Sequence, residues 1–265
     1  MPDMKTLRAL AQYPLFYAGL LLLGVMCLGL CMLAWAIRPF VSPQKGRTIG
    51  RAGISRGFRL YFALTTWLGL TRFELEALDA LDGQASMILA CNHPTFLDAV
   101  FLISRIRNAG CIMKADVLDN PFLGAGARLA DFIRNDSPRK MVRHAIRDLR
   151  QGSHVLVFPE GTRTIGHPVN EFKPGFALIA KGAKVPVQTL FIENNSPFLC
   201  KGWPIHHRPP SFPMVYRVRL GKRFTVGDDA KLFTRELQHY FEHELARAEL
   251  AITVQPSPSE RPVHD

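Results

Sequence analysis

The sequence is poor in cysteine and in acidic residues, and both shortages exclude classes of protein. Its five cysteines are odd in number, and no two of them have the Cys-x-x-Cys spacing of a zinc knuckle. The pattern therefore indicates neither a disulfide framework nor a zinc site, and it favours a reducing compartment. Only 22 acidic residues accompany 33 lysines and arginines, so the net charge is +11. This charge favours an anionic partner, which could be nucleic acid, an acidic membrane surface or an acidic carrier protein.

Charged residues are absent between Leu15 and Ile37. As a helix this run would extend about 34 Å, which is enough to cross a bilayer. Six lysines and arginines follow it between residues 38 and 59 without any acid, and this asymmetry predicts that the rest of the chain is cytoplasmic. We therefore expect an N-terminal transmembrane helix within residues 1–40. A re-entrant hairpin that does not cross, bent at one of the glycines in the run, stays open as an alternative.

Residues 41–72 form a basic segment that is also rich in aromatic side chains. A helix over residues 54–70 could lie in the lipid headgroup plane or pack on a protein core, and the sequence leaves both open. The segment also contains Gly53-Ile54-Ser55-Arg56-Gly57, which matches the GxSxG pattern of serine hydrolases. Because no buried strand precedes this match, we interpret it as chance.

Short apolar runs alternate with helical patterns after residue 72. Strands are expected at residues 73–76, 87–90, 110–113 and 155–158. This alternation predicts an α/β fold with a largely parallel central sheet flanked by helices. Residues 214–220 are expected to form an edge strand, residues 230–252 an amphipathic helix, and residues 253–265 a disordered tail. The sequence thus predicts one folded domain over residues 73–252.

A candidate general base follows the strand expected at residues 87–90. Asn92-His93-Pro94 is a turn signal, and Pro94 suits the first position of a helix. Asp98 would then lie within that helix, and its side chain could fold back so that the carboxylate contacts the imidazole of His93. A carboxylate bonded to one ring nitrogen stabilises the imidazolium that forms when the other nitrogen takes a proton. A histidine beside an aspartate at a helix start is also a common structural arrangement. This pair alone therefore does not distinguish a catalytic role from a structural one.

A second polar turn, Pro159-Glu160-Gly161-Thr162-Arg163-Thr164, follows the strand expected at residues 155–158. Gly161 permits a tight turn that presents a carboxylate, a hydroxyl and a guanidinium. Ligands of parallel sheets collect at the carboxyl ends of the strands, where this turn and the His93 turn are both expected.

Together these two turns resemble those of the glycerolipid acyltransferase family, which includes bacterial 1-acylglycerol-3-phosphate acyltransferases and belongs to the lysophospholipid acyltransferase superfamily. Phe172-Lys173-Pro174-Gly175 and Val185-Pro186-Val187 agree with it, so the resemblance extends over residues 73–192. It implies a membrane-bound enzyme of phospholipid biosynthesis that moves a fatty acyl group from acyl-ACP or acyl-CoA to a lysophospholipid hydroxyl. The implied location is a bacterial-type inner membrane, with the catalytic domain on the cytoplasmic face.

The resemblance also implies a role for each residue of the motifs. His93 would be the general base and Asp98 the residue that orients it. The substrate-binding residues would be Glu160, Gly161, Thr162, Arg163, Lys114 and Arg134. Glu160 would contact the acceptor, and Arg163 and Lys114 would supply positive charge for its phosphate. The family requires no metal and no cofactor beyond the acyl thioester.

Arg134 departs from the family pattern. Family members with phosphate acceptors usually have Phe-Ile-Asp-Arg here, whereas this chain has Phe132-Ile133-Arg134-Asn135, with the arginine one place early. In a strand, such a shift moves the side chain to the opposite face. Two alternatives therefore stay open: the same chemistry on a specialised acceptor, such as a polyene or ornithine-lipid precursor, or a non-catalytic lipid-binding membrane protein. A nucleic-acid partner is not expected, because no base-stacking motif accompanies the basic residues.

Overall fold

The computed structural model describes residues 4–121, 124–166, 168–204, 206, 207, 209 and 211–254. Within these residues, seven strands form one sheet in the order β1-β7-β6-β2-β5-β3-β4. The strands are β1 Thr71–Glu74, β2 Ile88–Cys91, β3 Ala109–Met113, β4 Ile133–Arg134, β5 His154–Val157, β6 Val187–Asn194 and β7 Met214–Phe224. Strands β6, β2, β5, β3 and β4 run parallel, which confirms the predicted α/β fold with a largely parallel sheet. The predicted tail lies, from residue 255 on, outside the described residues.

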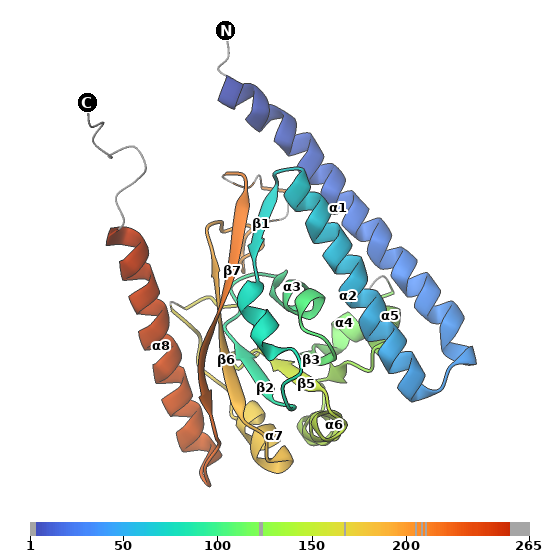
Figure 1. Cartoon of the computed structure of the whole chain (residues 1–265), viewed down its shortest axis with the longest axis vertical. Coiled ribbons are helices and arrows are strands. Elements are labelled where there is room, and N and C mark those ends of the chain that lie inside the picture. The colour runs from blue at the N-terminus through green and yellow to red at the C-terminus, as the bar shows by residue number, and fades with distance from the viewer. Residues whose placement is uncertain are drawn as a thin grey trace.

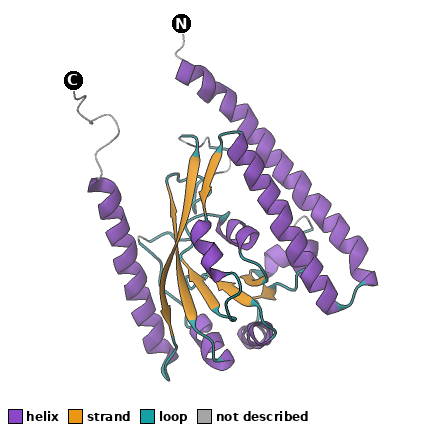
Figure 2. Ribbon diagram, in the orientation of Figure 1, coloured by secondary structure: helices purple, strands orange, loops and turns teal. Residues whose placement is uncertain are grey.

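Helices cover both faces of the sheet (Figures 1 and 2). The longer ones are α1 Met4–Ile37, α2 Pro43–Trp67, α3 Asp98–Arg105, α6 Pro138–Arg150, α7 Gly175–Ala183 and α8 Ala230–Val254. The short ones are η1 Arg38–Phe40, η2 Glu76–Leu81, α4 Ala115–Asp119 and α5 Gly124–Leu129. One core joins the sheet to α1, α2 and α3, and a second core joins its other face to α6, α7 and α8. The chain thus forms three layers.

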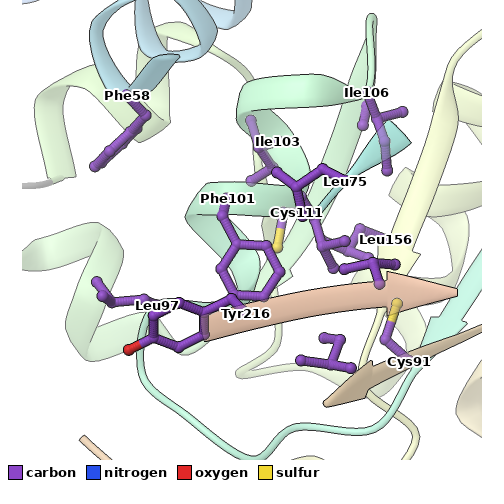
Figure 3. Close-up of a cluster of buried hydrophobic side chains, with 14 of the residues drawn as sticks. Phe58, Leu75, Cys91, Leu97, Phe101, Ile103, Ile106, Cys111, Leu156 and Tyr216 are labelled. Carbon is purple, nitrogen blue, oxygen red and sulfur yellow. The ribbon is translucent and has the colours of Figure 1, made fainter. Parts of the chain in front are cut away.

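The alternation of side chains along β2 explains how the two cores form. Leu89 and Cys91 face the α2 and α3 layer, whereas Ile88 and Ala90 face the opposite layer, and all four are fully buried. Strands buried on both faces have continuous apolar sequences, which is why β2 was visible in the sequence. Figure 3 shows the first of these cores, where Phe101 of α3 and Tyr216 of β7 lie side by side.

Two expectations about the elements are corrected. The predicted edge strand at residues 214–220 instead lies inside the sheet, between β1 and β6, and it pairs antiparallel with β6. Its alternation of basic and apolar residues suggested an edge, but the arginines pair with carboxylates of neighbouring elements, as Arg219 does with Glu193 and Glu244. The basic segment forms a longer helix than expected, which begins at Pro43 after the capping residue Ser42.

Helix α1 and the following η1 contain a segment, Gln12–Phe40, that is long and apolar enough to cross a membrane by length and composition. One face of this helix packs on the domain through Phe16, Cys27, Cys31 and Ala34. The remaining faces expose apolar side chains, including that of Val25. Helix α2 runs back along α1 (Figure 1) and contributes Phe58, Tyr61 and Phe62 to the core beneath it. Of the two alternatives for the basic segment, the structure therefore favours a helix packed on the protein core over a helix that lies only in the lipid headgroup plane.

A buried ion pair fixes α2 to the second layer. The guanidinium of Arg51, 5% exposed, donates to Oδ2 of Asp148 at 2.8 Å and to the carbonyl oxygen of Ala130 at 3.0 Å. Arg47 donates to the other carboxylate oxygen of Asp148 at 2.9 Å. A Cβ at Gly110 would collide with the Asp148 carboxylate, so glycine is needed beside this pair. Several arginines expected at a lipid surface thus hold the fold together.

Candidate active site

The carboxyl ends of four parallel strands bring the predicted site residues to one edge of the sheet. β2 ends immediately before the turn that carries His93, and β5 ends before the turn that carries Glu160. Lys114 follows β3 and Arg134 ends β4, further along the same edge. Parallel pairing of β2 with β5 places the first two turns next to each other. The prediction that these two distant turns meet is confirmed.

His93 and Asp98 form a hydrogen-bonded pair at this edge. The imidazole Nδ1 lies 2.9 Å from Oδ2 of Asp98. The Asp98 side chain is completely buried, whereas 18% of the His93 side chain is exposed. In the neutral imidazole, Nδ1 donates its proton to the carboxylate, and Nε2 then carries the free lone pair. The pair can therefore accept a proton from a group that reaches the exposed side of the ring.

The helix that carries Asp98 begins later than the sequence suggested. Pro94 does not open a helix, because residues 92–97 form a turn and α3 begins at Asp98 itself. Within that turn, the backbone N–H of Thr95 donates to Oδ2 of Asp98 at 2.8 Å, and its hydroxyl donates to Oδ1. An aspartate in the first helical turn also interacts favourably with the helix dipole. Thr95 thus holds the carboxylate in place, a role that the sequence analysis did not identify.

The carboxylate of Glu160 is hydrogen-bonded to both turns. Its Oε1 accepts the backbone N–H of His93 at 3.0 Å and the hydroxyl of Thr164 at 2.8 Å. Its Oε2 accepts the backbone N–H of Asn170 at 2.8 Å, and the residue is only 2% exposed. The family resemblance implies that Glu160 contacts an acceptor, but in the structure its carboxylate accepts two backbone N–H groups and the Thr164 hydroxyl. In the structure, Glu160 therefore stabilises the backbone of the His93 turn.

Burial affects the protonation of both carboxyl groups. The pKa of Asp98 is raised by burial, although the hydrogen bonds from His93 and Thr95 oppose this shift. Burial likewise raises the pKa of Glu160 against the hydrogen bonds that it accepts. Perturbed carboxyl groups of this kind are common where a protein positions a base.

Two neighbours fix the orientation of the His93 turn. The imidazole stacks on the ring of Phe158, with centroids 3.9 Å apart and an interplanar angle of 18°. Asn92 exchanges two hydrogen bonds with the backbone of Ile192, at 2.9 and 2.8 Å. The turn is therefore held by both β5 and β6, the two strands that flank β2.

The second turn contributes Gly161, Thr162 and Arg163. Gly161 has φ of +69°, a conformation that side-chain-bearing residues rarely adopt. The guanidinium of Arg163 donates to the carbonyl oxygen of Leu199 at 2.8 Å and lies over the ring of Phe96. The hydroxyl of Thr162 accepts from Nζ of Lys201 at 3.3 Å. These contacts add the loop after β6 to the site, and Lys201 is a cation there that the sequence analysis did not single out.

The loop after β6 also contacts α1. Phe16 of α1 packs edge-on against Phe198, with ring centroids 5.0 Å apart. The hydroxyl of Tyr17 donates to the carbonyl oxygen of His206 at 3.2 Å. The loop after β6 thus connects the apolar helix to the Arg163 turn.

The two remaining predicted residues lie apart from this cluster. Lys114 is exposed at the end of β3. Arg134 donates twice to the carboxylate of Asp119, with both distances 2.7 Å, and once to Asp136 at 2.5 Å. Its charge is therefore compensated by two aspartates. Ser55 of the GxSxG match lies in the middle of α2 and donates to the carbonyl oxygen of Ser104, so it is no nucleophile elbow.

These features define a class of protein: an α/β domain whose buried aspartate orients a histidine at the carboxyl edge of the sheet, beside a Pro-Glu-Gly-Thr-Arg turn. The family model described as Acyltransferase matches residues 72–193. This segment is therefore an acyltransferase-family domain, and the resemblance inferred from the motifs is confirmed.

Relatives of known description match the same part of the chain. A probable 1-acyl-sn-glycerol-3-phosphate acyltransferase of Mycoplasma genitalium is 27% identical over 143 residues, which are 49% of this chain and 52% of that protein. A lyso-ornithine lipid O-acyltransferase of Rhodobacter capsulatus is 36% identical over 89 residues, 32% of each chain. The chain thus spans about half, or less, of the length of these two relatives.

A solved structure shares the fold. The crystal structure of the 1-acyl-sn-glycerophosphate acyltransferase PlsC of Thermotoga maritima superposes with a TM-score of 0.66. The superposition covers 94% of this chain and 99% of the other, at 16% sequence identity. The similarity therefore includes the N-terminal helices as well as the sheet.

Proposed function

We propose that this chain is a membrane-bound O-acyltransferase of phospholipid biosynthesis, which transfers a fatty acyl group from acyl-ACP or acyl-CoA to a lysophospholipid hydroxyl. The observation that carries this proposal is the partly exposed imidazole of His93, hydrogen-bonded through Nδ1 to a fully buried Asp98. The acyltransferase-family match over the same residues supports the choice of reaction.

The transfer needs no covalent enzyme intermediate. Nε2 of His93 removes the hydroxyl proton of the acceptor while its oxygen attacks the thioester carbonyl. The new C–O bond forms, the C–S bond breaks, and the departing thiolate takes the proton back from the imidazolium. Asp98 stabilises the imidazolium between these two steps, and such general-base assistance typically contributes about 10² to 10⁴ in rate.

The proposed acceptor is 1-acylglycerol 3-phosphate. The name of the Mycoplasma relative supports it, and so does the positive charge near the site. Lys201, Lys114 and Arg163 are the cations suited to a phosphate, because the backbone carbonyl oxygens to which Arg163 donates are neutral and leave its charge uncompensated. A lysine binds phosphate as a flexible point charge, without the planar geometry of arginine.

A second acceptor, a lyso-ornithine lipid, is favoured by one observation. The position that usually carries the phosphate-binding arginine is Asn135 here, and the charge of its neighbour Arg134 is taken up by Asp119 and Asp136. The name of the Rhodobacter relative is consistent with this acceptor.

We further propose that α1 attaches the enzyme to the cytoplasmic face of a bacterial inner membrane. The apolar side chains on the outer faces of α1 support attachment. A water-insoluble acceptor would then reach His93 from the lipid phase.

Thiol release from acyl-CoA and from acyl-ACP tests the proposal. Purified wild-type protein and His93→Ala are compared in detergent, each with 1-acylglycerol 3-phosphate, lyso-ornithine lipid or no acceptor. His239→Ala is the matched control, because this histidine is exposed on α8. We expect acceptor-dependent release by wild type and His239→Ala, and a loss of about 10² or more in His93→Ala. Release with lyso-ornithine lipid alone would select the second acceptor. No release with any acceptor would favour a non-catalytic lipid-binding protein.

A further inference from the structure

A polar cavity of about 450 Å³ lies at the turn between α1 and α2. Four arginines line it: Arg38 at the end of α1, Arg47 of α2, Arg128 of α5 and Arg147 of α6. Asp131 is the acidic residue among its lining residues. Elements far apart in the sequence therefore direct positive charge to one hollow.

Ion pairs within the protein neutralise only part of this charge. Arg147 donates to Asp131 at 3.1 Å, and Arg47 donates to Asp148 at 2.9 Å. Arg128 is exposed and uses one guanidinium nitrogen to donate to the neutral carbonyl of Leu118. Arg38 is exposed on the short helix η1. Arg38 and Arg128 thus keep their positive charge available for an anion.

The first turn of α2 adds to this field. Ser42, Pro43 and Gln44 line the cavity, and the hydroxyl of Ser42 accepts the backbone N–H of Lys45. The amino end of a 25-residue helix carries a partial positive charge and favours anions. Together with two unneutralised guanidiniums, this end suits a phosphate group, whose oxygens accept several hydrogen bonds at once.

Large apolar side chains are exposed around the same turn. The side chain of Phe40, in η1 next to Arg38, is 87% exposed, and Trp35 one turn earlier is also exposed. Aromatic residues beside arginines are typical of the boundary between lipid headgroups and acyl chains. The surroundings of the cavity therefore favour a phosphate that belongs to a membrane lipid.

The cavity is distant from the part of the catalytic edge that carries His93. Phe16, in the half of α1 away from the α1–α2 turn, contacts the loop that bonds Arg163. Arg38 follows Phe16 by 22 residues, which correspond to about 33 Å of helix. A phosphate in the cavity is therefore not the phosphate of an acceptor whose hydroxyl faces His93.

We propose that the cavity at the α1–α2 turn binds the phosphate of an anionic membrane phospholipid, at a site separate from the catalytic one. Arg38 and Arg128 supply the positive charge, and the first turn of α2 supplies the helix dipole. The lipid would hold this end of α1 at the membrane surface. Binding of this kind requires no acyl transfer, so it can be tested whether or not the proposed reaction is correct.

Vesicle binding of Arg38→Gln/Arg128→Gln tests the site. The matched control is Arg235→Gln/Arg247→Gln, which removes the same charge from exposed positions of α8, on the far side of the sheet (Figure 1). Binding is measured by co-sedimentation with phosphatidylcholine vesicles, with and without one fifth phosphatidylglycerol. Each basic residue near an anionic surface contributes about fivefold to binding. We therefore expect the binding of the first variant to the anionic vesicles to fall about 25-fold, and that of the control to fall less than twofold.

Two results of this assay would overturn the proposal. Equal losses in the two double variants would mean diffuse attraction by the net charge. An equal loss on vesicles without phosphatidylglycerol would mean that the variant has lost general membrane affinity or its fold. Arg38→Gln alone removes no hydrogen bond to the residues that the structure describes, so a loss of fold is not expected of it. Its binding to the anionic vesicles should still fall about fivefold.

Inorganic phosphate distinguishes the two sources of the ligand. Without vesicles, we expect phosphate at millimolar concentration to raise the melting temperature of wild type no more than that of Arg38→Gln/Arg128→Gln. A phosphate-dependent rise confined to wild type, with unchanged vesicle binding in the variant, would assign the site to a soluble phosphate and overturn the lipid assignment.

Discussion

Asp98 is the residue that orients His93 and stabilises its imidazolium. Asp98→Asn keeps the size of the side chain but removes the charge that stabilises an imidazolium. We expect kcat to fall about 10² to 10⁴, with KM changed by less than about threefold, because this interaction strengthens only when the proton is transferred. Steady-state thiol release measures both constants. A kcat within tenfold of wild type would contradict the assignment of Asp98.

Glu160 should make stability depend on pH in a particular direction. Burial raises the pKa of this carboxyl, so the folded chain binds a proton more tightly than the unfolded chain. Its contribution to the free energy of unfolding is therefore complete below the unfolded pKa and is lost as pH rises through the raised pKa. Glu160→Gln has no such group.

The measurement is urea unfolding of wild type and Glu160→Gln in detergent at pH 7 and pH 5. We expect wild type to gain stability relative to the variant as the pH falls between these values. The other titrating groups, including Asp98, are common to both proteins and cancel in the difference. A difference that is the same at both pH values would show that the pKa of Glu160 is not raised.

The residues of the site divide by how far the sequence could predict them. His93, Asp98 and Glu160 belong to short motifs that follow apolar strand runs, so their edge of the sheet was predictable. Thr95 and Asn170 hold the two carboxylates through backbone N–H groups. Any residue except proline can donate a backbone N–H, so residue type carries no signal for such a role. The hydrogen bond from the backbone of His93 to Glu160 could therefore be found only from the fold.

At the scale of elements, the buried pair Arg51 and Asp148 tests how α2 is held. Arg51→Met leaves the Asp148 carboxylate buried with Arg47 as its remaining cation. Removing one partner of a buried pair typically costs about 3–5 kcal/mol, and Arg47 should keep the cost near the lower limit. Urea unfolding measures it. Arg56→Met, at an exposed position of the same helix, should change stability by less than about 0.5 kcal/mol. Similar effects of both changes would contradict this role of Arg51.

Elements were predictable where one local pattern decided them. Strands β2 and β5 are buried on both faces, and their apolar runs identified them. Strand β7 was placed at an edge because basic residues alternate along it, yet Glu193 and Glu244 pair with its Arg219 inside the sheet. Pro94 was expected to open α3, but the Thr95 contacts to Asp98 hold that stretch as a turn. In both cases, tertiary partners outweighed a correct local preference.

At the scale of the whole molecule, the position of α2 limits how α1 can meet a membrane. Helix α2 runs beside α1 and carries Arg47, Arg51, Arg56 and Arg59 (Figure 1). If α1 crossed the bilayer while packed in this way, the exposed Arg56 and Arg59 would enter the hydrocarbon region. Each would cost at least about 2.5 kcal/mol at the bilayer centre. The structure therefore favours neither a crossing helix nor the alternative hairpin, because α1 continues through the glycines of the run without a break. It favours an unbroken helix that enters the membrane without crossing it.

The depth of Val25 distinguishes these two arrangements. Val25 lies near the middle of α1 and is 59% exposed. In a protein with Trp35, Trp67 and Trp203 replaced by Phe, Val25→Trp is bound to vesicles with bromine at shallow or deep acyl positions. We expect shallow bromines to quench its fluorescence more, because α1 lying along the surface keeps its middle near the headgroups. Leu232→Trp on α8 is the control and should not be quenched. Stronger quenching by deep bromines would mean that α1 separates from α2 and crosses, since a transmembrane helix has its middle at the bilayer centre.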